Sequence, residues 1–260
     1  MPHIKRIRKM RRSIAIVMTL IGSMGFMLAQ DSIKVYGRVT DFNQLPLDSV
    51  TVYLKDKTFS NLYSATTDKN GKYSMTIKKG KYNCLYAIKL SDYGKTKLEY
   101  WAWNVPAFQD LEINPQYERM EIYGVNAFEP QVTPYETYMI YFRPMSLTKS
   151  LKFTNLANRK ELEKKASVNK DTINIAPDYI SKEELNVSVN NIPAEVLCIN
   201  KISENARGAI MYAYSIQIKK PKSDVQMPNA YDKITIILHS KETGEYGKGE
   251  YFLEKKQITH

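Results

Sequence analysis

The chain has 260 residues, 43% hydrophobic and 11% aromatic, so it can bury the cores of two small domains or of one large β domain. The formal net charge of +11 would suit a nucleic-acid partner, but six basic residues stand within the first 12 positions, ahead of an apolar run. The other lysines alternate with acidic residues, as on a solvated sheet face, so no nucleic-acid partner is expected. Two cysteines, Cys84 and Cys198, are too few for a disulfide framework. Both lie in apolar alternations, which favours two buried thiols and leaves one long-range disulfide as the alternative.

Residues 1–30 have the composition of a cleavable export signal, with basic residues followed by the apolar run "SIAIVMTLIGSMGFMLA". The run is short for a membrane span and contains Gly22 and Gly25, so a retained anchor is the less favoured interpretation. We expect cleavage near Ala29 or Gln30 and export by the general secretory route. The mature protein would then have no transmembrane span and would lie in the periplasm or at the cell surface.

Alternation of apolar and polar residues with a period of two dominates the first half of the chain, and each such stretch predicts a half-buried strand. Pro115 interrupts the last stretch, which predicts an edge strand or two short pieces. The turn Asp68–Gly71 and the link Lys79–Gly80 predict a hairpin within residues 66–82. Short strands at regular spacing predict a β-sandwich. The predicted strands cover residues 33–39, 50–54, 73–77, 82–88, 97–105 and 110–125.

A proline-bearing stretch at residues 128–136 predicts a domain boundary near Val132, which divides the exported chain into residues 31–132 and 133–260. Helix formers after Asn155 predict one short surface helix over residues 155–166. The whole chain is therefore predicted to be all-β, with two β-sandwich domains, the second Ig-like or related, and one short surface helix between them. A glycine-rich hairpin turn, "KETGEYGKG", is expected between the last two strands. Strand patterns in the second unit cover residues 137–145, 185–189, 195–202, 209–218, 233–240 and 249–255.

Residues 35–94 carry an ordered set of motifs: "GRVTD", a proline before the second strand in "LPLDSVTVYL", the turn "TDKNGKYSM", the stretch "KKGKY" and the closing "LSDYG". In this order and spacing they resemble the carboxypeptidase regulatory-like family, which is found in many exported proteins of Bacteroidetes-type bacteria. The resemblance is strong over residues 33–94 and weaker up to about residue 128. It implies a seven-stranded, transthyretin-like sandwich without catalytic residues. The zinc peptidase from which this family takes its name is absent here.

Histidine is too scarce for most catalytic sites. His3 leaves with the signal and His260 is terminal, so His239 alone remains for a catalytic triad or a metal site. His239 and Glu242 have the H-x-x-E spacing of two zinc ligands, but the third ligand is lacking, so we interpret the match as chance. We expect no metal, no cofactor and no catalytic residues. An envelope hydrolase stays as an alternative, because a carboxylate pair can come from distant positions in a fold.

The stretch "EYWAWNVPAF" holds the main candidate binding residues. Trp101 and Trp103 are two positions apart and therefore project from the same face of a strand. If that face is exposed, the two rings and Tyr100 form an aromatic platform for a glycan; if it is buried, the rings fill the core or the cleft between the two units. The core interpretation is favoured, because aromatic residues in small domains are mostly buried. Arg143 is expected to pair with a carboxylate at the domain junction or, as the alternative, to bind an anionic ligand.

Three short patterns, at Ser32, Ser49 and Thr172, resemble the O-glycosylation acceptors of Bacteroides-type exported proteins, although this permissive pattern often occurs by chance. The predicted function is that of an exported, non-catalytic module that has a structural role or binds an envelope protein or glycan. Within binding, the alternative is a carbohydrate-binding accessory protein that uses an aromatic platform.

Overall fold

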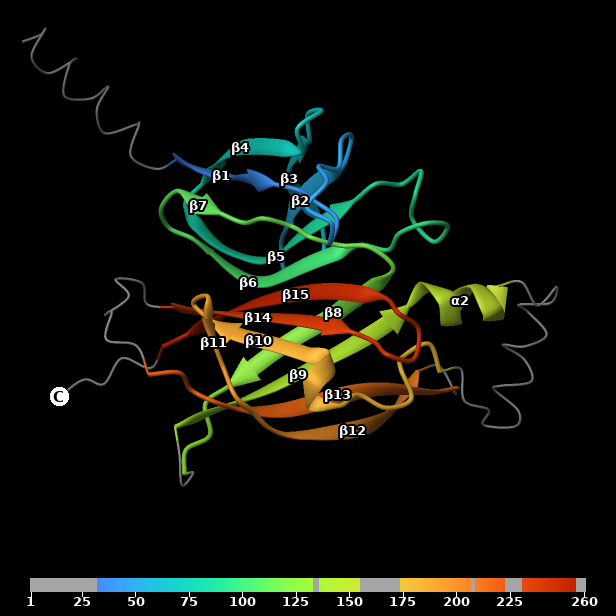
Figure 1. Ribbon diagram of the computed structural model, residues 1–260. Helices are drawn as coiled ribbons and strands as arrows, with labels where there is room; N and C mark the ends of the chain where they lie inside the picture. The colour runs from blue at the N-terminus through green and yellow to red at the C-terminus, as the bar shows by residue number, and fades with distance from the viewer. Residues whose placement is uncertain (1–31, 133–135, 155–173, 207–208, 223–230, 256–260) are drawn as a thin grey trace, which may run out of the picture.

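The computed structural model describes residues 32–132, 136–154, 174–206, 209–222 and 231–255, and over these residues the predicted all-β fold is confirmed. Figure 1 shows an upper lobe of strands β1 to β7 and a lower lobe of strands β8 to β15, and one long mixed sheet, called the middle sheet below, runs through both lobes. The elements are β1 (Ser32–Arg38), β2 (Thr51–Lys55), β3 (Asn61–Thr66), β4 (Lys72–Lys78), β5 (Gly80–Ile88), β6 (Tyr100–Ala107), β7 (Leu111–Glu112), β8 (Met120–Phe128), β9 (Thr137–Ser146), α2 (Leu147–Thr154), the 3₁₀ turn η2 (Lys182–Glu184), β10 (Leu185–Val189), β11 (Ile192–Pro193), β12 (Val196–Ala206), β13 (Ala209–Lys219), β14 (Tyr231–His239) and β15 (Tyr246–Glu254).

The upper sandwich is built from strands β1 to β7. The sheet β4-β1-β7 packs against one half of the eight-stranded middle sheet, which has the order β11-β10-β14-β15-β6-β5-β2-β3. Strict alternation in β4 points Tyr73, Met75 and Ile77 into the core between these sheets, where they are 1–6% exposed. Burial of such side chains is worth roughly 1.5–3 kcal/mol each, so this inward row supplies much of the sandwich's stability.

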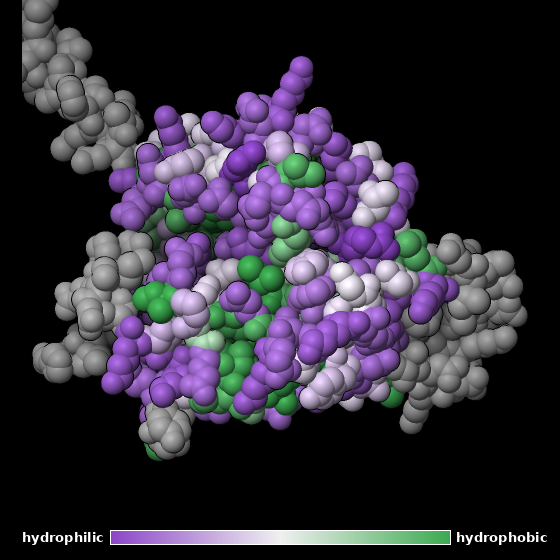
Figure 2. Space-filling model, viewed as in Figure 1, coloured by the Kyte–Doolittle hydropathy of each residue, from purple (hydrophilic) through white to green (hydrophobic). Residues whose placement is uncertain are grey.

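The lower sandwich uses the opposite face of the middle sheet. Strands β10, β14 and β15 pack with their apolar face on the sheet β12-β13-β9-β8, and their inward residues include Ile234, Ile236 and Leu238 at 0% exposure. The surface in Figure 2 is mostly hydrophilic over the upper lobe, whereas apolar residues gather between β10 and β12 in the lower one. Each half of the middle sheet is therefore covered on one side by a second sheet, the upper lobe and the lower lobe on opposite sides.

The two lobes meet at a seam where β15 pairs in parallel with β6, which makes the middle sheet continuous. Phe252 of β15 is buried in the upper core, while Trp103 of β6 packs against the lower core, so each seam strand contributes to the other lobe. Gly247 and Gly249 face β8, and a Cβ built on Gly249 would stand 2.8 Å from the carbonyl oxygen of Ile122. Only glycine permits this close approach of β15 to β8.

One strand arrangement differs from the sequence-based expectation. Residues 66–82 do not form the predicted hairpin: β4 pairs with β1 in the upper sheet, whereas β3 and β5 both pair with β2 in the middle sheet. The turn Asp68–Gly71 and the link Lys79–Gly80 therefore carry the chain from one sheet to the other and back. An alternating pattern specifies which face of a strand is buried, not which strand it pairs with.

The domain boundary near Val132 stays a prediction, and two observations bear on it. Strand β8, which lies before Val132 in the chain, belongs to the lower core, and the β6–β15 pairing joins residues on the two sides of the predicted boundary.

The helix predicted over residues 155–166 falls outside the described residues; α2 (Leu147–Thr154) directly precedes it. Both cysteines are free thiols; Cys84 is buried as expected, whereas Cys198 is only half-buried, on β12 at the end of its sheet.

Candidate functional site

The two tryptophans lie side by side on β6. Trp101 is opposite Gly249 of β15, and Trp103 is opposite Tyr251. Their rings are offset and nearly parallel, with centroids 5.2 Å apart and 15° between the planes. The Trp101 side chain is 7% exposed, while Trp103 is half-buried, and its indole nitrogen is enclosed without a hydrogen-bond partner among the described residues. The pair therefore stacks on itself and does not form two open coplanar rings.

Three further rings surround the indoles. Phe59 meets both edge-on, at 6.5 Å from Trp101 and 6.1 Å from Trp103, and Tyr123 meets both edge-on at 5.4 and 5.2 Å. Tyr86 lies 4.3 Å from Trp101. Edge-to-face contacts of this kind add roughly 0.5–1.5 kcal/mol each beyond the buried area. We call these five residues, Phe59, Tyr86, Trp101, Trp103 and Tyr123, the aromatic cluster.

Phe59 is the most exposed ring of the cluster, and a strained turn holds it there. Its φ is +63°, in the left-handed region that bulky residues rarely adopt, and 45% of the residue is exposed. The carboxylate of Asp56 fixes the turn by accepting hydrogen bonds from the backbone N–H groups of Thr58 (2.8 Å) and Ser60 (2.9 Å). The turn thus keeps a large apolar ring at the surface, against the conformational preference of that residue.

A pair of carboxyl groups lies behind Trp101. Its Nε1 donates to Glu121 Oε1 at 2.8 Å and to Glu99 Oε1 at 3.1 Å, and the Tyr86 hydroxyl donates to Glu99 Oε2 at 2.6 Å. Burial and the neighbouring Glu99 raise the pKa of Glu121 well above its ordinary value, although Trp101 and Arg143 act in the opposite direction. Glu99 and Glu121 are only 7% and 2% exposed, so this carboxyl pair is closed to a substrate.

Arg143, on β9, completes the surroundings of the cluster. Its Nε donates to Glu204 Oε2 at 3.1 Å, Nη2 donates to the same oxygen, and the Tyr141 hydroxyl also donates to Glu204. The guanidinium lies over the ring of Tyr123 at 5.9 Å from its centroid. Arg143 therefore has a carboxylate partner within the lower lobe and touches the cluster through Tyr123.

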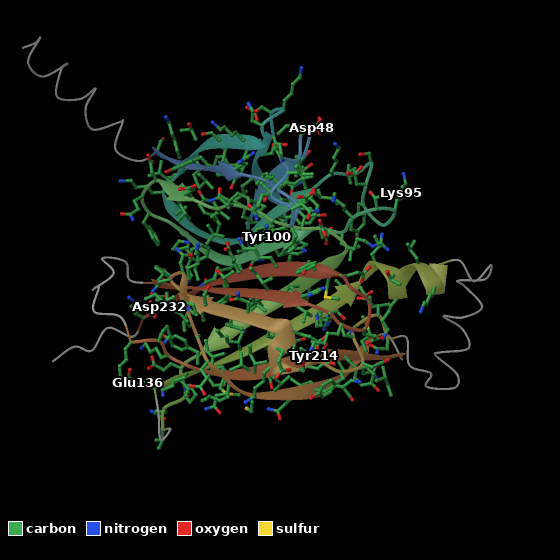
Figure 3. All side chains as sticks on the ribbon, viewed as in Figure 1. Asp48, Lys95, Tyr100, Glu136, Tyr214 and Asp232 are labelled. Carbon is green, nitrogen blue, oxygen red and sulfur yellow. The ribbon has the colours of Figure 1, made fainter. Side chains whose placement is uncertain are left out.

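Tyr100, the remaining candidate binding residue, lies apart from the others. It points to the opposite face of β6, is 0% exposed, and donates from its hydroxyl to Glu250 Oε2 at 2.5 Å. Figure 3 labels it at the seam between the lobes. Trp101, Trp103 and Arg143 are thus brought together, and Tyr100 is not. Sequence reasoning missed Phe59, Tyr123 and the Glu99–Glu121 pair; only the Glu99–Trp101 spacing of two positions carried a local signal for any of them.

The other residues singled out in the sequence lie at scattered places. Ser32 and Ser49 are exposed, and Thr172 falls outside the described residues. His239 stacks on Tyr246 with 3.9 Å between ring centroids, while Glu242 accepts from Lys149 at 2.7 Å. Across the described part of the chain, no group of three His, Cys, Asp or Glu side chains is placed to hold a metal ion. None of its helices has the length and hydrophobicity that crossing a bilayer requires.

Comparison with known proteins gives little further information. No protein-family model and no curated protein matches the chain. Among solved structures, the major pilin subunit BcpA of Bacillus cereus is 12% identical, with a TM-score of 0.26 over 86% of this chain and 69% of the pilin. A DUF3823 family protein from Parabacteroides merdae is 11% identical, with a TM-score of 0.26 over 86% of this chain and 99% of that protein. The full-length major pilin SpaD of Corynebacterium diphtheriae is 9% identical, with a TM-score of 0.25 over 85% of this chain and 64% of the pilin.

TM-scores this low carry no argument about the function of this chain. The all-β, sandwich-like architecture rests on the strands and sheets described above. The resemblance of residues 33–94 to the carboxypeptidase regulatory-like family remains a prediction. Strands β1 to β7 and their two-sheet arrangement agree with the seven-stranded sandwich that this resemblance implies, without establishing the family.

Proposed function

We propose that the protein is an exported, non-catalytic β-sandwich module of the bacterial envelope that binds another envelope protein through the aromatic cluster. The observation that carries this proposal is the exposed ring of Phe59, held at the surface by a strained turn over two tryptophans. Strain in a turn persists only where the surroundings enforce it, and it is concentrated at functional sites. Aromatic residues at the rim of a rigid sheet are typical anchors of protein interfaces.

A glycan platform is the less favoured ligand site at this place. Sugars stack on flat, open aromatic faces, but here Trp101 is 7% exposed and stacks on Trp103. Phe59, the most exposed ring, stands edge-on to both indoles, and this uneven surface suits the irregular side chains of a protein partner better.

A non-catalytic role is supported by the burial and the hydrogen bonds of Glu99 and Glu121. The Glu99–Glu121 pair is closed to solvent, and Trp101 and Tyr86 use its oxygens. A hydrolase would need at least one of its two carboxyl groups within reach of a substrate oxygen. We therefore place these carboxyl groups in the support of the cluster and assign them no bond-breaking step.

The proposal is tested by capturing envelope proteins on immobilised wild-type protein and on two variants. Phe59→Asn removes the ring, and asparagine tolerates the left-handed turn, so the fold is retained. Phe128→Asn is the matched control, since Phe128 is also exposed, at 60%, and lies outside the cluster. We expect a partner that wild type and Phe128→Asn retain and Phe59→Asn loses. Equal recovery by all three proteins would contradict the proposal.

Tryptophan fluorescence can then show whether the recovered partner contacts the aromatic cluster. The chain contains two tryptophans, both in the cluster, so its tryptophan emission reports on this place. After the emission of the partner alone is subtracted, addition of the recovered partner should shift the tryptophan emission of the wild type. An unchanged spectrum at saturating partner would place the contact elsewhere.

A further inference from the structure

A groove of about 650 Å³ lies on the face of the middle sheet opposite the aromatic cluster, where no described strand covers β10, β14 and β15. Glu112 and Asn114, at and just after β7, form one wall of the groove, and β10, β14 and β15 form its floor. Its volume lies in the range of small-molecule sites, which are often found between domains. The residues of its floor that carry the argument are Asn186, Ser188, Lys233, Thr235, Lys248 and Glu250.

The floor is built around a buried ion pair. Glu250 is 2% exposed and accepts from Tyr100, and its Oε1 lies 3.1 Å from Lys248 Nζ and 3.8 Å from Lys233 Nζ. Thr235 also donates to this carboxylate, at 3.3 Å. Burial opposes the charged form of Glu250, but the charges of Lys248 and Lys233 outweigh it and lower its pKa. Apolar residues of the same volume often stabilise a fold as well as a buried ion pair does, so an ion pair beneath a groove indicates a role in ligand binding.

The charges of the floor leave one cation available to a ligand. Lys248 is 12% exposed, neutralises Glu250 and donates to the Asn114 carbonyl at 3.0 Å, so its ammonium is committed. Lys233 is more open, at 29%, and is farther from the shared carboxylate. On the opposite wall, the exposed carboxylate of Glu112 accepts from Asn114 Nδ2 at 3.0 Å and repels an anion. A ligand carboxylate would therefore be directed towards Lys233 and away from Glu112.

The rest of the lining is rich in hydroxyl and amide groups. Asn186 is exposed and Ser188 is half-buried, and both lie on the same face of β10 because they are two positions apart. Thr235 is their neighbour on β14, opposite Ser188. Among the described residues that line the groove, Pro193 and Ile237 are the apolar ones, so there is little to bind the apolar side chains of a peptide.

We infer that this groove is a second binding site, separate from the aromatic cluster, for an acidic saccharide. Lys233 holds the ligand carboxylate, and Asn186, Ser188 and Thr235 exchange hydrogen bonds with its hydroxyl groups. The inference does not depend on the proposed function, because the tryptophans project from the opposite face of β6.

The test is calorimetric titration of the purified protein with tetragalacturonate, in parallel with the neutral maltotetraose and the acidic peptide tetraglutamate. We expect heat of binding from tetragalacturonate and little from the other two. Lys233→Gln should weaken binding about tenfold or more, the loss expected for a charged hydrogen bond. Lys69→Gln, the same change in an exposed turn, should leave binding unaltered. Glu112→Gln should strengthen it.

Several results would overturn the inference. These are no binding of tetragalacturonate, equal binding of maltotetraose or tetraglutamate, or unchanged affinity in Lys233→Gln. Amide chemical shifts provide a second readout, since the ligand should change the shifts of Ser188 and Thr235 and leave those of Trp101 and Trp103 unchanged. Perturbation confined to the tryptophans would assign the saccharide to the aromatic cluster instead.

Discussion

The close approach of β15 to β8 can be tested by adding a single methyl group. A Cβ on Gly249 would lie 2.8 Å from the Ile122 carbonyl oxygen and 2.9 Å from Val125 Cγ2, about half an ångström or more inside ordinary contact. One of these atoms is backbone, so the strands themselves must move apart. Overpacking of this kind costs about 1–3 kcal/mol. We therefore expect Gly249→Ala to lower the free energy of unfolding by about 2 kcal/mol.

Gly80→Ala is the matched control for this change. Gly80 is also in a strand of the middle sheet, and the atom nearest to its Cβ would be a Tyr82 ring carbon at 3.7 Å, which is ordinary contact. Replacing a strand glycine where there is room is neutral or stabilises by up to about 1 kcal/mol. Urea unfolding followed by tryptophan emission measures both variants, and Trp101, opposite Gly249, reports the seam. Equal stability of the two variants would refute the close-packed seam.

Three further changes have expected outcomes. Burial raises the pKa of Glu121 in the folded protein, so stability should fall as pH rises above about 4.3, the ordinary glutamate pKa. Glu121→Gln should flatten this fall and be more stable than the wild type at pH 7; urea unfolding over a pH series that shows no difference between the two proteins would contradict this. Phe59→Asn should leave the free energy of unfolding of the isolated protein unchanged or raise it, because relief of the turn strain, about 1 kcal/mol, offsets the lost ring contacts. A decrease of more than about 2 kcal/mol in the free energy of unfolding, measured in the same assay, would make Phe59 a core residue. Glu250→Ala should lower the free energy of unfolding by about 3–5 kcal/mol, because it leaves Lys248 and the Tyr100 hydroxyl buried without their partner. A decrease below about 1 kcal/mol would show that this ion pair is not buried.

Sequence patterns predicted the strands well because each strand buries one face. The alternation in residues 73–77 and 233–240 corresponds closely to β4 and β14. The predicted glycine-rich turn is confirmed only in its first half: residues 240–245 join β14 to β15, whereas residues 246–249 lie in β15. Pro115 separates β7 from β8, as its missing N–H requires. Strand β3 was missed, since its edge position leaves most of its residues exposed and weakens the alternation.

Pairing between distant strands could not be predicted. The β6–β15 pair joins residues about 150 positions apart, and nothing local to Trp101 or Gly249 specifies the other. The spacing of Trp101 and Trp103 did predict a common face. Tyr123 contacts the two tryptophans only because β8 crosses beneath the seam. The chain has 19 tyrosines, and nothing in the sequence distinguishes this one as a neighbour of the tryptophans. The same holds for the Glu99–Glu121 pair, which tertiary packing brings together behind one indole.

The central claim is that the surface at Phe59 contacts another protein in the envelope. Site-specific photo-crosslinking in living cells tests it most directly, with benzoylphenylalanine in place of Phe59 and, as the control, in place of Phe128, which is also exposed and lies outside the aromatic cluster. The account predicts a discrete protein adduct from position 59 and none of that mass from position 128. Absence of an adduct at position 59, or the same adducts from both positions, would contradict it.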